Sequence, residues 1–172
     1  RDEAVEVIRE LRKAGLSKIV MMTGDSERTA KAIAKRVGVD EYYAEVLPED
    51  KAGFCEKEKA AGRKVIMIGD GINDSPALSA ANVGIAISDG AELAREISDI
   101  TIGADDLSVM VTLKEISNGL MTKIHKNYRR IMGINGTLIA LGVTGVIQPT
   151  MSALLHNTST LLIGMDSMKS VL

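Results

Sequence analysis

The pattern of apolar and polar residues changes character at Arg130. Before that residue, short apolar runs alternate with segments in which apolar residues recur every three or four positions, as they do along the buried face of a helix. The runs predict strands at residues 18–22, 42–46, 64–68, 83–87 and 100–102. The periodic segments predict helices at residues 4–14, 26–37, 48–61, 75–81 and 107–130, the first two of which end at Gly15 and Gly38.

Strands that alternate with helices of this length indicate an α/β fold built on a parallel sheet. In such sheets ligands bind beyond the carboxyl ends of the strands. Two Gly-Asp pairs, Gly24-Asp25 and Gly69-Asp70, follow the first and third expected strands. We therefore expect a ligand site at that edge of the sheet.

Beyond Arg130 the chain is almost free of charge, since of its 21 Lys and Arg and 23 Asp and Glu only Asp166 and Lys169 lie there. A membrane-spanning helix requires roughly 20 mostly apolar residues. Residues 131–147 and 150–172 meet this requirement on either side of a Gln-Pro turn signal, so the pattern predicts a transmembrane helical hairpin. A buried hairpin of a soluble protein is the alternative.

The residues before the hairpin are basic, which places that end in the cytoplasm by the positive-inside rule. They are Lys123, Lys126, Arg129 and Arg130. We expect three parts: an α/β domain at residues 1–107, a stalk helix at 108–130 and two transmembrane helices at 131–172. The expected protein is a multi-pass protein of the plasma membrane with its soluble domain in the cytoplasm. Because the chain begins inside a charged helix, it looks like a fragment.

Composition removes several other classes of function. A net charge of -2 gives no reason to expect nucleic acid as a partner, and an aromatic content of 2% makes stacking on bases or sugars an unsuitable mode of binding. Cys55 is the only cysteine, so the chain holds neither an internal disulfide nor a CxxC metal site.

The polar residues at the expected strand ends suit phosphate chemistry. Asp70 and Asp74 lie four positions apart and could share one Mg2+, which prefers one or two carboxylates together with phosphate and water oxygens. Thr23 and Gly24 offer a hydroxyl and a backbone N–H to phosphate, and Lys51 supplies positive charge. Each feature also has an ordinary interpretation, as a turn or as a solvated first-turn lysine. Their joint appearance, in order and at strand ends, favours the catalytic interpretation.

Three stretches resemble the successive phosphorylation-domain motifs of P-type ATPases, which have a haloacid-dehalogenase-like fold. They are Met22-Thr23-Gly24-Asp25, Pro48-Glu49-Asp50-Lys51 and Gly69-Asp70-Gly71-Ile72-Asn73-Asp74-Ser75-Pro76-Ala77-Leu78. The resemblance covers essentially the whole chain, and the third stretch is highly specific. Its details favour the heavy-metal-transporting subfamily, in which a single helical hairpin follows this domain.

The resemblance implies an ATP-driven pump with Mg2+ and ATP as cofactors, of which this chain would be the second half of the phosphorylation domain and the last two membrane helices. Asp70 would bind Mg2+, with Asp74 in support. Thr23, Gly24 and Asn73 would hold the transferred phosphoryl group.

Two further roles and one gap follow from the same resemblance. Lys51 would neutralise the phosphoryl group, and Asp25 would assist nucleotide handling and domain closure. The family's nucleophile is the Asp of an Asp-Lys-Thr-Gly-Thr motif, which does not occur here. The remaining parts of the pump would therefore be partners of this chain, which alone would not turn over ATP.

Polar groups at membrane depth mark ion pathways or helix–helix hydrogen bonds. We expect His156 and Asn135, with Ser159 and Thr160, to contact the transported cation. Imidazole suits first-row transition metals, whereas Ca2+ and Mg2+ prefer oxygen cages. The expected cargo is zinc, cadmium, cobalt, manganese or iron, with copper less favoured because Ile134 replaces the Tyr of the Tyr-Asn pair in copper pumps.

Two other functions remain open at this point. A soluble haloacid-dehalogenase-type phosphatase would use the same phosphate site, but it has no need for an uncharged hairpin. A non-enzymatic membrane adaptor would have no need for the phosphate site.

Overall fold

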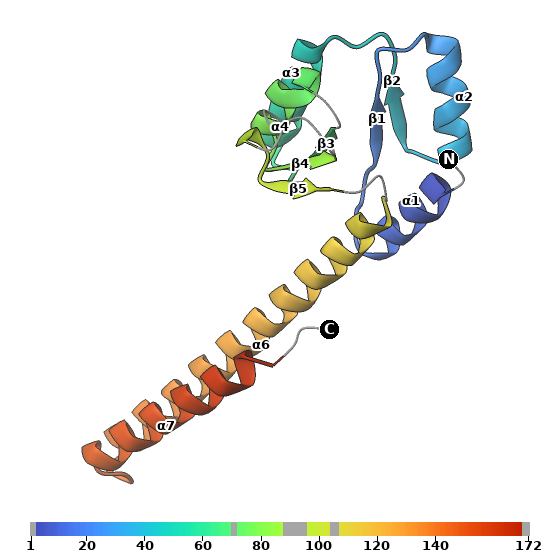
Figure 1. Cartoon of the computed structure of the whole chain (residues 1–172). Helices are drawn as coiled ribbons and strands as arrows, with labels where there is room; N and C mark the ends of the chain where they lie inside the picture. Colours follow the sequence, from blue (N-terminus) through green and yellow to red (C-terminus); the bar gives the residue numbers. More distant parts are fainter. Residues whose placement is uncertain (1–2, 70–71, 88–95, 104–106, 170–172) are drawn as a thin grey trace. The chain divides into compact units, whose positions relative to one another are not determined.

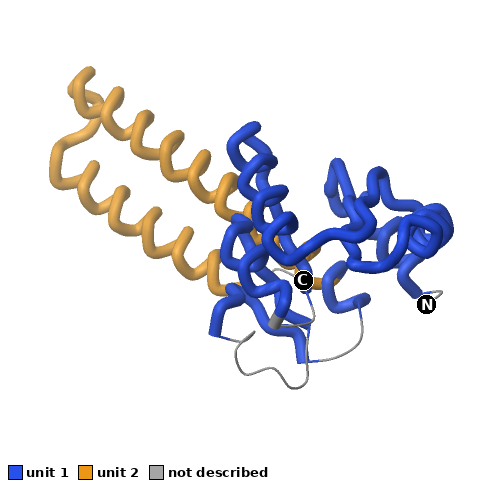
Figure 2. The backbone as a smooth tube through the Cα atoms, turned by 90° about the horizontal axis from the view of Figure 1, so that it is seen from above, with its two compact units in different colours: residues 1–111 blue, residues 112–172 orange. Residues whose placement is uncertain are grey.

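The computed structural model describes the whole chain except residues 1–2, 70–71, 88–95, 104–106 and 170–172. It divides into two compact units, residues 1–111 and residues 112–172 (Figure 2).

The described residues of the first unit form five short strands, and every strand pair is parallel (Figure 1). β1 (Val20–Met22) pairs with β2 (Glu41–Tyr43), with Val20 opposite Glu41. β4 (Val83–Ile87) lies between β3 (Ile66–Gly69) and β5 (Ile100–Ile102). The expectation of one parallel sheet is wrong in this respect, because no strand of the described residues joins β1 to β3.

The helices of this unit lie close to their expected positions. They are α1 (Glu3–Lys13), α2 (Glu27–Val37), α3 (Pro48–Ala60) and α4 (Ser75–Ala80), the last preceded by the 3-10 turn η1 (Ile72–Asp74). α2 ends as the sequence predicts: Gly38 adopts φ 81°, and its N–H donates to the Ala34 carbonyl at 2.9 Å. α3 begins with Pro48 in its first turn, and the Asp50 carboxylate accepts from the Leu47 N–H at 3.2 Å.

The core of the first unit is small and joins α3 and α4 to the second sheet. Its buried members are Cys55, Met67, Ala77, Leu78 and Ala86, and Met22 at the end of β1 packs against them. Met22 and Met67 belong to different sheets, so this cluster connects the two sheets although β1 and β3 are not paired.

The second unit is a helical hairpin made of α6 (Ser108–Val143), from residue 112 onward, and α7 (Pro149–Ser167). Contacts pair early residues of one helix with late residues of the other, so the helices are antiparallel. Asn127 donates to Ser167 at 2.6 Å, whereas Asn135 lies 2.9 Å from His156. The turn between them includes Gly145, with φ 73°.

None of the helices in the described part of the chain is both long and apolar enough to cross a membrane. The prediction of two spanning helices is therefore not confirmed. Of the uncharged stretch 131–147, only the part up to Val143 belongs to α6, and α7 carries the polar run 156–160 at its middle.

Asp40 ties the first sheet to α1, and we expect it to make stability depend on pH. Its carboxylate accepts from the Ile19 N–H at 2.7 Å and from Arg12 at 3.0 Å, and these bonds lower the pKa of Asp40 from its ordinary 3.8. A lowered folded-state pKa stabilises the fold above 3.8, and this contribution is lost as pH falls through the folded value. In urea unfolding, Asp40→Asn should be less stable than wild type at neutral pH, with a gap that narrows well below pH 3.8.

A matched control is Glu49→Gln, which removes a carboxylate without an ion pair among the described residues. Comparing the two variants at each pH separates loss of the Asp40 contacts from loss of a carboxylate as such. An Asp40→Asn difference that is independent of pH would contradict the linkage.

Candidate functional site

The first unit holds a buried ion pair directly after β3. Lys51 Nζ lies 2.7 Å from Asp74 Oδ1, and the two side chains are only 16% and 11% exposed. Lys51 belongs to the first turn of α3, and Asp74 ends η1, which follows β3. Two residues that the sequence assigns to one site are therefore in direct contact, 23 positions apart in the chain.

Gly69 allows this carboxylate to lie against the end of β3. A Cβ atom at Gly69 would be 2.6 Å from Asp74 Cβ and 2.8 Å from Asp74 Oδ2. Such distances are sterically forbidden, so any other residue at position 69 would displace Asp74 or the strand. The sequence pattern predicts a motif at Gly69 but not this steric role.

Replacing Gly69 should therefore disturb the ion pair. We expect Gly69→Ala to destabilise the fold by about 1–3 kcal/mol, the usual cost of forcing an extra group into a packed site. Gly53→Ala is the matched control, because a Cβ at that position in α3 meets nothing within 4 Å. It should stabilise by about 0.5–1 kcal/mol through helix propensity. Denaturant unfolding of both variants measures this, and equal effects would contradict the steric argument.

Thr23 forms a compact turn after β1. Its hydroxyl donates to Asp25 Oδ2 at 3.0 Å and accepts from the Asp25 N–H at 3.1 Å. The Gly24 N–H has no hydrogen-bond partner within the described residues, so it is available to an anion. The turn thus presents a backbone donor beside a hydroxyl, an arrangement suited to phosphate oxygens.

A short loop links the Thr23 turn to α3. The Val46 N–H donates to the Thr23 carbonyl at 3.0 Å, and the Glu45 N–H donates to the Asp25 carbonyl at 3.0 Å. Glu45 adopts φ 54°, which is unusual for a residue with a side chain. Leu47 follows and starts α3, so this loop fixes where the helix that carries Lys51 begins. No pattern in the sequence indicates the positive φ of Glu45.

The structure gives fewer contacts for the other residues at or near the predicted site. Asn73 lies in η1 and is exposed. Asp70 lies outside the described residues, so its convergence with Thr23, Lys51 and Asp74 stays a prediction. Ser75, next to Asp74, has a buried hydroxyl oxygen without a partner in the described structure.

The donor set fits Mg2+ better than a transition metal. No cluster of three His, Cys, Asp or Glu side chains occurs among the described residues. Mg2+ does not need one, because it is commonly held by one or two carboxylates with phosphate oxygens and water. Asp74 supplies one such buried carboxylate, and the sequence places Asp70 four positions before it.

The hairpin brings together only part of the expected metal site. His156 Nδ1 lies 2.9 Å from Asn135 Oδ1, across the two helices. The hydroxyls of Ser159 and Thr160 donate to the His156 carbonyl at 2.8 and 3.0 Å, which is ordinary back-bonding within a helix.

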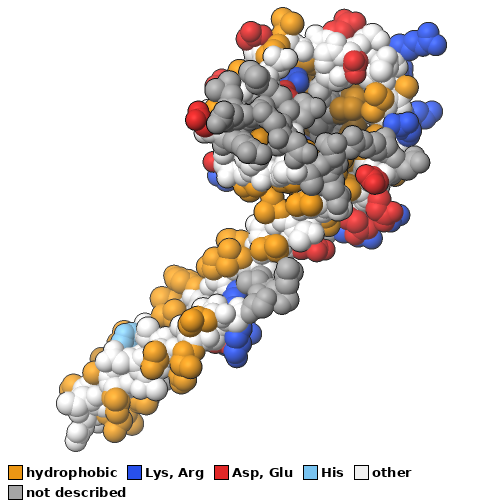
Figure 3. All heavy atoms as spheres, viewed as in Figure 1, with side chains coloured by type: hydrophobic (Ala, Val, Ile, Leu, Met, Phe, Trp, Pro, Cys, Tyr) orange, Lys and Arg blue, Asp and Glu red, His pale blue; other side chains and the backbone are white. Residues whose placement is uncertain are grey.

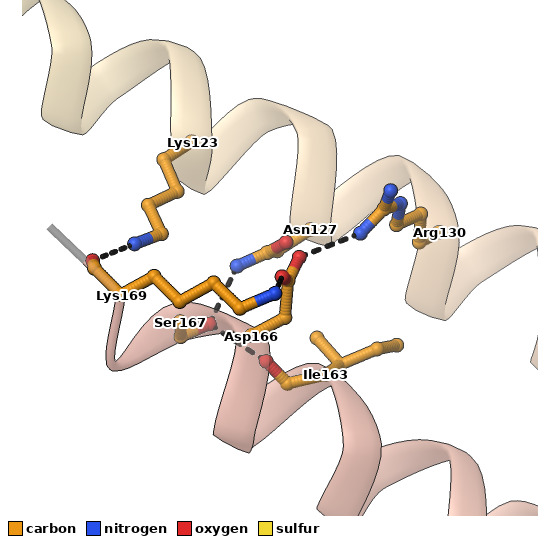
Figure 4. A network of polar contacts seen from close by, with 7 residues as sticks. All are labelled: Lys123, Asn127, Arg130, Ile163, Asp166, Ser167 and Lys169. Atoms are coloured by element: carbon orange, nitrogen blue, oxygen red, sulfur yellow. Dashed lines mark hydrogen bonds and ion pairs between the residues drawn. The ribbon is translucent and has the colours of Figure 1, made fainter. Parts of the chain in front are cut away.

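A second polar network lies nearer the open end of the hairpin (Figure 4). Asp166 accepts from Arg130 of α6 at 3.0 Å and from Lys169 at 2.8 Å. Lys123 donates to the Lys169 carbonyl, and Asn127 donates to Ser167. These contacts fix the register of α7 against α6. The sequence offered only one signal for them, the isolated charges Asp166 and Lys169.

Comparison with known proteins extends these observations. Residues 1–82 match the family of haloacid dehalogenase-like hydrolases. The chain is 37% identical over 172 residues to a manganese-exporting P-type ATPase of Mycobacterium leprae and to a zinc-exporting P-type ATPase of Mycobacterium marinum. Each alignment covers 99% of this chain but 24% of the relative, so the chain spans about a quarter of these proteins.

A solved structure of a zinc-transporting PIB-type ATPase in the E2.Pi state is also similar. It matches 97% of this chain with a TM-score of 0.87 and 32% identity, and the match covers 27% of that protein. The α/β fold is therefore of the haloacid dehalogenase-like type, and the chain is similar over nearly its whole length to part of the metal-transporting P-type ATPases.

Proposed function

We propose that this chain is part of an ATP-driven pump that moves a transition-metal cation across a membrane through an aspartyl-phosphate intermediate. The buried pair of Lys51 and Asp74, 2.7 Å apart at the end of β3, carries the proposal. A soluble scaffold has little use for such a pair, because desolvation of two charges offsets much of their attraction. A site that must hold a phosphoryl group and a metal ion needs both charges.

The proposed roles follow from the positions of these groups. Mg2+ would be held by Asp74 and Asp70, and when bound it would neutralise phosphate oxygens. Lys51 would exchange its contact with Asp74 for one with the transferred phosphoryl group. Thr23 and the free Gly24 N–H would bind its other oxygens, together with Asn73. Asp25, which accepts the Thr23 hydroxyl proton here, would release that proton to a phosphoryl oxygen and link the turn to nucleotide-dependent closure.

We infer the place of the nucleophile from the edges of β1 and β3 that are unpaired in the described residues. Among the described residues, β1 pairs only with β2 and β3 only with β4, and Met22 packs against the core cluster that contains Met67. A strand from outside these 172 residues could pair with both edges. Its carboxyl end would then lie beside the Thr23 turn and the Lys51–Asp74 pair. We propose that this strand carries the aspartate that is phosphorylated.

The hairpin would form the part of the cation pathway contributed by this chain. Asn135 Oδ1 can accept the proton of His156 Nδ1, which leaves the lone pair of Nε2 for a metal. Residues 131–143 of α6 and the whole of α7 contain a single acidic residue, Asp166, so they lack the carboxylates that Ca2+ prefers. Large apolar side chains are exposed along both helices, as expected where lipid or other pump helices cover them (Figure 3).

The two similar ATPases of Mycobacterium export different metals, so we propose the class of divalent transition metals and not one ion. The test uses a longer protein that contains this sequence, reconstituted in vesicles. Its ATP hydrolysis should be stimulated by Zn2+, Co2+ or Mn2+ and not by Ca2+. Metal-independent hydrolysis of small phosphate esters, without transport, would contradict a pump and favour the soluble phosphatase.

A further inference from the structure

A groove of about 370 Å³ runs along α6 in the second unit. Its lining changes from charged to apolar along the helix, with Arg129 and Arg130 at one end. The rest of the lining is Gly133, Ile134, Thr137 and Leu138. At 1.5 Å per residue, the distance along the axis from Arg130 to Leu138 is about 12 Å. The groove therefore has a cationic end, at Arg129 and Arg130, and an elongated part from Gly133 to Leu138, which we call its body.

The cationic end is short of negative partners. Arg130 contacts Asp166, which also neutralises Lys169, whereas Arg129 has no ion pair among the described residues. The acidic residue of α6 in the described chain is Glu115, fourteen positions before Arg129. A second groove of about 410 Å³, lined in part by Lys123 and Lys126, adds positive charge one to two turns earlier. This end of the groove is complementary to an anion.

The body of the groove offers hydrocarbon and no free donor. The Thr137 hydroxyl is satisfied by the Gly133 carbonyl at 2.9 Å. Gly133 has no side chain, and a Cβ there would meet nothing within 4 Å. Ile134 is half-buried, and Leu138 is buried. An occupant of this part would gain by removing apolar surface from water or by matching it with an acyl chain.

We propose that this groove binds an anionic glycerophospholipid, with its phosphate at Arg129 and Arg130 and the start of one acyl chain over Gly133 and Leu138. The proposal rests on the hairpin being the membrane part of the pump. One molecule with an anionic head and a hydrocarbon tail satisfies both ends of the groove. A free phosphate would satisfy only the first end.

The test measures lipid binding to the detergent-solubilised longer protein, without ATP or transported metal. Native mass spectrometry would count retained phosphatidylglycerol and phosphatidylcholine after delipidation and re-addition of either lipid. Gly133→Leu should fill the groove and remove the bound phosphatidylglycerol, and Leu also favours the helix more than Gly. Gly136→Leu is the matched control, because its Cβ likewise meets nothing within 4 Å and Gly136 does not line the groove.

Arg129→Gln tests the headgroup contact separately from the acyl-chain contact. It removes no ion pair or hydrogen bond of the described residues. It should weaken phosphatidylglycerol about fivefold and leave phosphatidylcholine unchanged, because one basic residue near an anionic headgroup contributes about that much. Equal retention in wild type and Gly133→Leu would overturn the proposal. Displacement of the lipid by glycerol phosphate at similar concentration would also overturn the proposal, because the groove would then bind the phosphate group alone and gain nothing from the acyl chain. Since no pumping is measured, failure here is distinct from failure of the proposed function.

Discussion

Replacement of Lys51 by Met should lower phosphorylation from ATP about 100- to 1,000-fold, the usual cost of removing a preorganised charge from a transition state. The variant should also lose stability, because Asp74 is left buried without its partner. Loss of one member of a buried pair costs about 3–5 kcal/mol. Phosphoenzyme formation and denaturant unfolding of the same preparation measure the two effects separately.

The double variant Lys51→Met/Asp74→Asn distinguishes catalysis from folding. Without either charge, the desolvation cost disappears, so stability should recover relative to Lys51→Met. Phosphorylation should not recover, since both the charge near the phosphoryl group and a magnesium ligand are missing. Recovery of activity in the double variant would mean that the pair is structural. Lys57→Met, at an exposed position of the same helix, should leave both measurements unchanged.

The second large effect concerns the hairpin. His156→Ala should abolish stimulation of ATP hydrolysis by the transported metal, while phosphorylation by inorganic phosphate without metal persists. Asn135→Ala should retain the ligand but lose the bond that orients it, which typically weakens metal affinity about 10- to 100-fold. Metal-binding titrations and ATPase assays should therefore show a larger loss in His156→Ala than in Asn135→Ala.

The chain provides its own control for this experiment. His125 is the other of the two histidines, lies exposed on α6 and is outside the proposed site. His125→Ala should behave as wild type. Wild-type metal affinity in His156→Ala would mean that this ring only bonds to its neighbouring helix.

Much of the first unit could be predicted from local patterns. Strands β4 and β5 begin and end at the expected residues, because continuous apolar runs bounded by polar residues are strong strand signals. α2 ends at Gly38 as expected, because a left-handed cap strongly favours glycine. These features depend only on residues that are neighbours in sequence.

The division into two sheets could not be predicted in the same way. β1 and β3 could belong to one sheet only if they paired with each other or with a strand between them. No run of apolar residues in the sequence specifies which strands pair. The sequence also separated a stalk helix from a membrane helix at Arg130, whereas α6 continues to Val143 without interruption. A change from charged to apolar residues alters the surroundings of a helix and not its backbone.

The candidate site was predicted as a set of residues but not as a set of contacts. Lys51 and Asp74 were both assigned to phosphoryl transfer, yet their direct ion pair depends on the close approach at Gly69. The φ of Glu45, which shapes the loop leading to α3, has no sequence signal because glutamate rarely adopts it. Contacts of this kind are tertiary, and a single sequence does not specify them.

We propose that this chain completes a site that forms an aspartyl phosphate, with Mg2+ bound near Asp70 and Asp74. The most direct measurement is the label retained after acid quenching when a longer protein that contains this sequence is incubated with radiolabelled ATP and Mg2+. In wild type the label should be acid-stable and released by hydroxylamine, as an acyl phosphate is. In Asp70→Asn it should be absent or severely reduced. Label that resists hydroxylamine, or equal labelling in Asp70→Asn, would contradict the account.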